Sequence, residues 1–191
     1  IDEVREALKD IISDDKRARD VVTRLRALVK KKESLSEPFD LNATIRETIR
    51  LLHSETLLRK ASIKMDLAPE LPVMRGDRIQ IQQVVINLIM NSLDAVQDLP
   101  QDSRLIEVTS RTADEPGIRL TVNDSGPGIA PEVLDSIFEP FYTTKAQGTG
   151  LGLTVCRSIA ATYGGRLQAE NRSEGGASVS LWLPAAEGGG R

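Results

Sequence analysis

The chain has 191 residues, of which 40% are hydrophobic and 28% charged, a balance typical of a folded globular protein rather than a disordered one. Its 25 basic and 28 acidic residues leave a formal net charge of −3, so no overall basic charge marks it as a nucleic-acid-binding protein. Its apolar runs are shorter than the ~20 residues of a membrane-spanning helix, and its single cysteine, Cys156, excludes an internal disulfide and fits a reducing compartment.

Residues 1–33 carry an apolar pattern that predicts one long helix. Apolar positions advance by alternate steps of four and three residues, the spacing of a coiled-coil seam, and neither Gly nor Pro interrupts the segment. Because such a helix cannot bury its stripe alone, we expect partner helices. The alternative is an ordinary N-terminal helix packed on the domain that follows. Asp15 occupies one seam position where an apolar residue would be expected. The other seam positions are Val4, Leu8, Ile11, Ala18, Val22, Leu25 and Val29.

Residues 34–38 are predicted to be a linker, because Pro38 ends any helical continuation. Residues 39–186 are predicted to form the folded domain, and residues 187–191 a flexible tail.

Helical patterns predict three substantial helices in this domain. The first two begin at residues suited to cap a helix N-terminus, Asn42 and Asp77, and Gln80 stands where it completes a capping box with Asp77. The second helix is apolar on most sides, which is typical of a buried helix. The predicted bounds are Asn42 to about Arg59, Asp77 to about Leu99, and Leu151–Tyr163.

Segments with strand patterns predict a sheet of about five strands. Because the helices do not alternate strictly with the strands, we expect a layer of helices on a mixed sheet, not a doubly wound fold. Pro140–Gly150 has no periodicity and is predicted to be a mobile loop. The predicted strands are Ala61–Leu67, Leu105–Arg111, Gly117–Asn123, Arg166–Asn171 and Ala177–Leu183, with a further short one at Phe39–Leu41 and a helical turn at Pro131–Asp135.

Four short motifs carry candidate chemistry. Asn87 and Asn91 lie four residues apart on the second helix and therefore share one face, where amide oxygens are neutral ligands suited to Mg²⁺. The alternative is that they cap neighbouring backbone. Asp124-Ser-Gly-Pro-Gly128 follows a strand, so its acid can accept a hydrogen bond from an exocyclic amine, although the run is also a good turn.

The other two motifs follow in the chain. Phe138-Glu-Pro-Phe141-Tyr-Thr-Thr-Lys145 holds three of the six aromatic residues and a lysine able to meet a phosphate. Gly148-Thr-Gly150-Leu-Gly152 opens a helix, where backbone N–H groups favour phosphate. Its spacing fits neither the Rossmann nor the P-loop pattern.

In this order and spacing, the motifs resemble the N, G1, F and G2 boxes of the histidine-kinase branch of the GHKL superfamily, which also contains Hsp90, type II topoisomerase and mismatch-repair ATPases. The resemblance covers residues 39 to about 184. It implies a Bergerat-type α/β sandwich, a mixed sheet covered by three helices, that binds ATP and Mg²⁺. Residues 1–33 resemble the second helix of a dimerisation and histidine-phosphotransfer hairpin, so one long coiled-coil-type helix is expected before the sandwich.

The resemblance also implies roles for individual residues. Asn91 would bind Mg²⁺, and Asn87 would support the phosphates or the metal. Asp124 would accept from the adenine amine, and Lys145 would reach the phosphates. The remaining expected nucleotide-binding residues are Asp94, Gly126, Gly128, Ile129, Gly148, Thr149, Gly150, Leu151 and Gly152, with Phe138 and Phe141 anchoring the loop over the nucleotide.

Asn87 favours a kinase over an ATPase. GHKL ATPases place a water-activating Glu one helical turn before the metal-binding Asn, and an amide at that position cannot act as a general base. Phosphoryl transfer needs mainly positioning and charge neutralisation. The alternatives are a GHKL-type ATPase, a nucleotide-gated interaction module and a serine kinase on the same fold.

The expected acceptor of the phosphoryl group is a histidine that this chain lacks. His53, the one histidine, is followed by Ser54, Glu55, Thr56 and Leu57, without the acidic neighbour and the Thr or Asn of the acceptor pattern. We therefore expect a fragment that does not phosphorylate itself.

By resemblance, its partners would be the histidine-bearing helix of the same or a partner kinase, a response regulator and a second copy bound through residues 1–33. The expected location is cytoplasmic, in a soluble kinase or in the cytoplasmic part of a membrane-anchored sensor.

Overall fold

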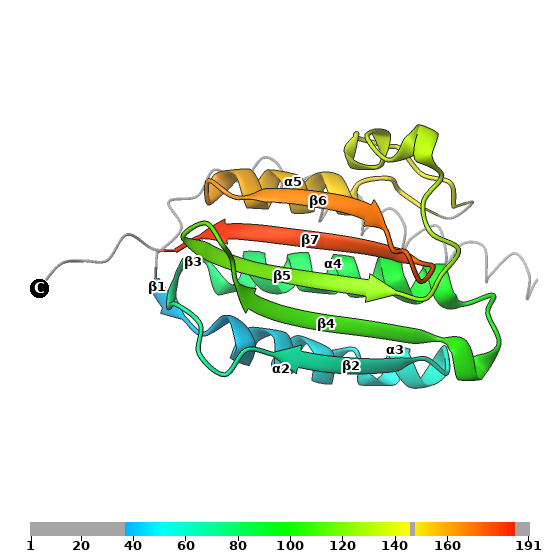
Figure 1. The fold of residues 1–191 in the computed structure, drawn as a ribbon, viewed down its shortest axis with the longest axis horizontal. Helices are drawn as coiled ribbons and strands as arrows, with labels where there is room; N and C mark the ends of the chain where they lie inside the picture. Colours follow the sequence, from blue (N-terminus) through cyan, green and yellow to red (C-terminus); the bar gives the residue numbers. More distant parts are fainter. Residues whose placement is uncertain (1–36, 146–147, 186–191) are drawn as a thin grey trace, which may run out of the picture.

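The computed structural model describes residues 37–145 and 148–185, which form a two-layer α/β sandwich (Figure 1). One layer is a five-stranded sheet, and the other contains the helices, which lie on one face of it. The expected sandwich is therefore present. The predicted helix at 1–33, most of the linker and the tail lie outside the described residues.

The main sheet has the strand order β2-β4-β5-β7-β6. Strands β2 (Ser62–Leu67) and β4 (Leu105–Thr112) are parallel. The other neighbours are antiparallel, namely β4 with β5 (Gly117–Asp124), β5 with β7 (Ala177–Pro184), and β7 with β6 (Arg166–Asn171). The sheet is thus mixed, as expected. Its strands lie within two residues of the predicted bounds.

Three helices cover the sheet, as predicted: α2 (Leu41–Leu51), α4 (Arg78–Val96) and α5 (Gly152–Thr162). The apolar residues of α4 that face the sheet are fully buried, and they pack with the inward side chains of β4, β5 and β7 in one continuous core. The central members of this core are Val84, Val85, Ile89, Leu93, Ile106, Val108, Leu120, Val122 and Leu181.

The first helix differs from the prediction at both ends. Asp40, not Asn42, caps it by accepting a hydrogen bond from the Ala43 N–H. Asn42 is buried instead and donates from its side chain to the Ala68 carbonyl at 2.8 Å. The helix ends at Leu51, and a separate short helix, α3 (His53–Leu58), follows without any Gly or Pro to mark the break.

Two very short strands pair outside the main sheet, and only the first was predicted, at Phe39–Leu41. β1 (Glu37–Phe39) pairs with β3 (Met74–Gly76) in an antiparallel ladder of three residue pairs. The first strand therefore begins two residues earlier than predicted. A strand of three residues is too short to show an alternating pattern, and its existence depends on a partner far away in the sequence. Residues 101–103, 131–133 and 136–138 each form a 3₁₀ turn.

The N-terminus of α4 is completed by a residue from another helix. Asp77 caps α4 as predicted, by accepting from the Ile79 N–H at 2.9 Å. The expected return bond from Gln80 to the Asp77 N–H does not form. That N–H donates to the Tyr163 hydroxyl at the end of α5, which in turn donates to Gln80 at 2.9 Å. The backbone of Gly76 lies so close to this ring that a Cβ there would meet it at 2.4 Å.

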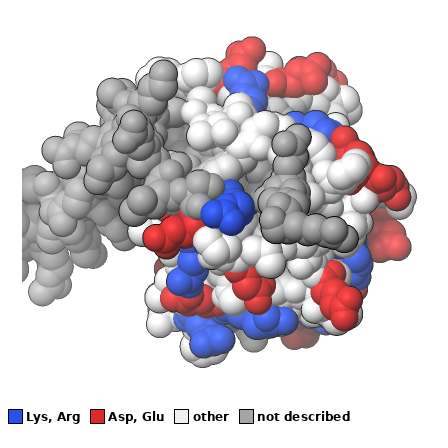
Figure 2. Space-filling model, turned by 90° about the vertical axis from the view of Figure 1, so that its left-hand side faces the viewer, with Lys and Arg blue, Asp and Glu red and all other residues white. Residues whose placement is uncertain are grey.

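Basic and acidic side chains are interspersed on the surface. Figure 2 shows this for the end of the molecule that lies on the left in Figure 1, where neither sign forms a continuous field. Several of these groups are ion-paired, among them Arg111 with Asp66 and Arg166 with Glu115. In the part of the chain that the structure describes, no helix has both the length and the apolar character needed to cross a membrane.

The hydroxyl of Tyr163 should stabilise the fold measurably. Tyr163→Phe leaves the partly buried Asp77 N–H without an acceptor, and we expect a loss of about 1–2 kcal/mol in the free energy of unfolding. Denaturant unfolding measures this loss. The matched control is Tyr142→Phe, which removes the other tyrosine hydroxyl. Equal stability of the two variants would show that the bridge between α4 and α5 contributes nothing.

Candidate functional site

One face of α4 carries the polar residues that the sequence singles out. Asn87, Asn91 and Asp94 follow one another at steps of four and three residues, and all three are half-buried in a helix whose sheet-facing side is fully buried. Because polar groups in such a position need partners, their contacts identify the segments that meet at this face.

Asp124 meets the helix at the residue next to Asn91. It ends β5 and is only 5% exposed. Its Oδ1 accepts from the N–H groups of Gly126 at 2.9 Å and Ala177 at 3.2 Å, and its Oδ2 faces the Ser92 hydroxyl at 3.5 Å. Burial raises the pKa of the Asp124 carboxyl, and these hydrogen bonds only partly oppose the shift.

The glycines after Asp124 allow backbone to pack tightly against the helix. A Cβ on Gly126 would come within 3.0 Å of the Ala95 side chain and carbonyl. Gly128 has a φ of +82°, the left-handed region that favours glycine. Ile129 exchanges two hydrogen bonds with the Asn171 side chain, at 2.7 and 2.6 Å. Sequence reasoning missed Asn171, because nothing local signals a contact across 42 residues.

The two phenylalanines of the third motif lie in different surroundings. Phe138 is buried, and its carbonyl accepts from the Thr154 hydroxyl of α5 at 3.2 Å. Phe141 is 69% exposed, so the expectation that both rings anchor the segment is wrong for Phe141. The backbone of Phe141, which has a φ of +66°, connects this segment to the fourth motif, because its N–H donates to the Gly150 carbonyl at 3.1 Å.

Lys145 brings the third motif to the face of α4. Its Nζ lies 2.6 Å from Asp94 Oδ2 and 3.5 Å from Asn91 Oδ1. The amide oxygen of Asn91 therefore already faces a cation, although a positively charged side chain and not a metal ion.

Asp94 has a second cationic partner that sequence reasoning missed. Arg59, at the end of α3, pairs with Asp94 Oδ1 and also with Glu55 at 2.7 Å. Burial lowers the pKa of Arg59, but the hydrogen bonds and charges of Glu55 and Asp94 outweigh it and raise the pKa overall. The guanidinium of Arg59 is therefore charged at neutral pH.

The fourth motif reaches the same face through Asn87, whose side-chain amide donates to the Gly152 carbonyl in the first turn of α5 at 3.4 Å. Gly150 has a φ of +65°, and a Cβ there would overlap the Phe141 backbone at 2.3 Å. Leu151 is buried, and Gly148 and Thr149 are half-buried. The backbone from Gly148 to Gly152 thus leads into the N-terminus of α5, and a helix N-terminus favours an anion.

The second, third and fourth motifs therefore all contact α4, the helix that carries the first. Ser92 contacts Asp124, Lys145 contacts Asn91 and Asp94, and Asn87 contacts Gly152. Such a site combines a buried acid that can accept from an amine with a lysine and backbone N–H groups that can meet negative charge. These groups suit a ligand that has both a negatively charged group and a ring that donates a hydrogen bond.

The site also suits a hard divalent cation shared with that anion. The described residues contain no group of three His, Cys, Asp or Glu side chains able to enclose a metal. Mg²⁺ is usually held by one or two protein oxygens together with phosphate oxygens. The Asn91 oxygen, already next to the Lys145 ammonium, fits that requirement.

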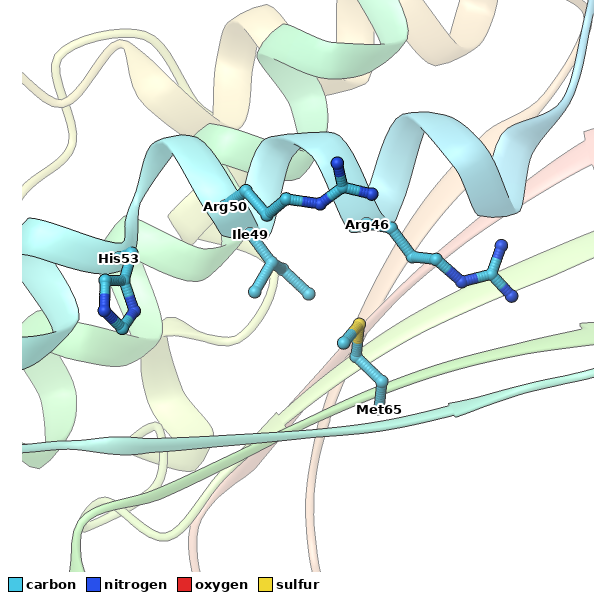
Figure 3. A pocket seen from close by; sticks show the side chains of 5 residues that line it. All are labelled: Arg46, Ile49, Arg50, His53 and Met65. Atoms are coloured by element: carbon cyan, nitrogen blue, oxygen red, sulfur yellow. The ribbon is translucent and has the colours of Figure 1, made fainter.

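His53 lies apart from this face. It lines a hollow of about 350 Å³ with Arg46, Ile49 and Arg50 of α2 and Met65 of β2 (Figure 3). None of these five residues belongs to the four motifs. The exposed imidazole begins α3, so the description of His53 as an ordinary helix residue agrees with its position.

Comparison with known proteins agrees with this geometry. Residues 76–187 match the family described as histidine kinase-, DNA gyrase B- and HSP90-like ATPases. The chain is 35% identical over 185 residues to the sensor histidine kinase TmoS of Ectopseudomonas mendocina, covering 96% of this chain and 19% of TmoS. It therefore spans about a fifth of that relative's length.

Solved structures show the same similarity. The nucleotide-free catalytic domain of the histidine kinase ThkA is 34% identical, with a TM-score of 0.70 over 81% of this chain and 97% of that domain. ThkA in complex with the response regulator TrrA is 28% identical, with a TM-score of 0.79 over 96% of this chain and 52% of that one.

The burial of Asp124 predicts how stability depends on pH. Because its pKa is raised in the folded state, the stabilisation it contributes is full below its ordinary value of 3.8 and is lost as the pH rises through the raised pKa. Asp124→Asn keeps an Oδ1 acceptor and lacks this dependence. We expect the stability of the variant relative to the wild type to increase from about pH 4 to pH 7.

Thermal unfolding across this range measures the difference, with the exposed Asp98→Asn as the matched control. A stability difference that does not change across this range would show that the charged hydrogen bonds balance the cost of burial, and a deficit of Asp124→Asn that grows with pH would show that they outweigh it.

Proposed function

The chain belongs to the family of histidine kinase-, DNA gyrase B- and HSP90-like ATPases, and within it to the sensor histidine kinases; we propose that it binds Mg-ATP and transfers the γ-phosphoryl group to a histidine of another segment or chain. The convergence of the four motifs on α4 is the observation that carries this proposal.

Each part of the nucleotide has a candidate partner among the residues that gather around α4. Asp124 accepts from the exocyclic amine of adenine, with Gly126, Gly128 and Ile129 against the ring. Lys145 and the backbone from Gly148 to Gly152 contact the phosphates. They are already in position when negative charge builds up in the transition state of phosphoryl transfer. Asn91 holds Mg²⁺ next to Asn87, and the metal supplies neutralisation of phosphate charge when bound.

Asn87 determines which reaction the site favours. Its side chain donates to the Gly152 carbonyl at 3.4 Å, so it is engaged as a donor in the first turn of α5. An amide has no basic group to take a proton from water. Asn87 therefore positions the glycine segment without promoting hydrolysis, and the attacking nucleophile has to come from the accepting histidine.

The accepting histidine lies outside these 191 residues. His53 is the one histidine of the chain, and it lines the hollow between α2 and β2, away from Lys145 and Asn91. We infer that a histidine-bearing helix of the same or a partner kinase supplies the acceptor, and that residues 1–33 join two copies. The next acceptor is then an aspartate of a response regulator, the class of protein bound to ThkA in the solved complex.

The first test is phosphoryl transfer. Incubated with γ-labelled ATP and Mg²⁺, the chain alone should incorporate no label, whereas an added histidine-phosphotransfer hairpin should gain acid-labile label. Acid-labile label on His53 would contradict the assignment of the acceptor. An acid-stable product would indicate transfer to serine, and rapid turnover of ATP without an acceptor would indicate an ATPase.

The second test concerns the metal ligand. Asn91→Ala should weaken Mg-ATP binding by roughly tenfold or more, about 1.4 kcal/mol, because it removes the neutral oxygen offered to Mg²⁺. Equilibrium dialysis with and without Mg²⁺ measures the effect. His53→Ala, the control, should bind as the wild type does. Equal losses in the two variants would contradict both assignments.

A further inference from the structure

We propose that Arg59 is a positioning residue for the nucleotide site, acting through Asp94 to leave the Lys145 ammonium available to the phosphates. This inference rests on the proposed function, because it concerns how the site receives a nucleotide. Arg59 belongs to none of the four motifs, and it comes from α3, on the opposite side of Asp94 from Lys145.

The carboxylate of Asp94 is shared between two cations. Its Oδ1 pairs with Arg59, and its Oδ2 lies 2.6 Å from the Lys145 Nζ. The same Nζ lies 3.5 Å from the Asn91 amide oxygen, one helical turn earlier on α4. Asp94 therefore holds the lysine at the place where the phosphates and their metal ion are proposed to bind.

Without Arg59, the negative charge of Asp94 would oppose nucleotide binding in two ways. It would repel the phosphates directly, because like charges at short range disfavour each other. It would also hold Lys145 as its only counter-ion, so that the lysine would have to give up that pair to reach a phosphate. A second cation on Asp94 relieves both effects.

Arg59 is suited to be the permanent partner and Lys145 the exchangeable one. The Arg59 side chain is 24% exposed, against 42% for Lys145, so water and salt screen its pair with Asp94 less. Arg59 is also held from behind by Glu55 at 2.7 Å, and its carbonyl accepts from Arg104 at 2.6 Å. Arg59 and Lys145 balance the charges of Asp94 and Glu55, so the four charges sum to zero and leave no net negative charge to repel an incoming anion.

A double-mutant cycle tests this role. Arg59→Gln, Asp94→Asn and the double variant are compared with the wild type by calorimetric titration with Mg²⁺ and a non-hydrolysable ATP analogue. We expect Arg59→Gln to weaken binding roughly five- to tenfold when Asp94 is present. The same substitution in the Asp94→Asn background should change affinity less than about twofold, because no carboxylate is then left to neutralise.

Three further variants separate this role from a structural one. Arg59→Lys keeps the charge and should recover part of the affinity. Glu55→Gln removes the other ion pair of Arg59 and should weaken binding less than Arg59→Gln does, because the guanidinium and its pair with Asp94 remain. Arg111→Gln, which breaks the ion pair with Asp66 away from the four motifs, is the matched control and should bind normally.

The outcomes are distinguishable. A wild-type chain that binds no nucleotide overturns the proposed function itself. Tight binding by both the wild type and Arg59→Gln overturns only the role of Arg59. A loss of affinity that persists in the Asp94→Asn background, or that Glu55→Gln reproduces, shows that Arg59 acts by supporting α3 and not through the charge of Asp94.

Discussion

The site depends on α4. This helix is buried along the side that faces the sheet, and the polar side chains on its other side need hydrogen-bond partners. Burying Asn87, Asn91 and Asp94 without partners would cost more than the surrounding apolar packing could readily offset. The structure meets this requirement by bringing a different loop or helix end to each residue. The polar face is thus both a folding constraint and the surface on which the functional segments gather.

The two acids of the site are accommodated in opposite ways. Asp124 lies at the end of a strand, where two backbone N–H groups and a hydroxyl surround its carboxyl and Arg172 donates to its backbone carbonyl, and burial keeps its pKa raised. Asp94 is half-buried between two cations. Asp124 is therefore an acceptor of modest charge, suited to a neutral ring. Asp94 instead keeps the ammonium of Lys145 next to the region proposed for the phosphates.

Local patterns predicted most of the fold and the motif residues that gather along α4, because helix caps, strand alternation and motif spacing are encoded by near neighbours. The three helices, the mixed sheet and the shared face of Asn87 and Asn91 all follow from such patterns. Arg59, Asn171 and the Tyr163 bridge did not, since each acts across more than 30 residues and no local signal marks it. The exposure of Phe141 was also missed, because residue type alone does not reveal that a backbone bond with positive φ holds that position.

The strand order also has a consequence for biosynthesis. The last strand along the chain, β7, is inserted between β5 and β6 rather than added at an edge, and its Ala177 N–H completes the surroundings of Asp124. During translation, β5 therefore keeps an open edge until β7 has left the ribosome. The hydrogen bonds around Asp124 cannot be completed on a growing polypeptide, so a product that terminates before β7 would lack both the pairing of β5 with β7 and the Ala177 contact to Asp124.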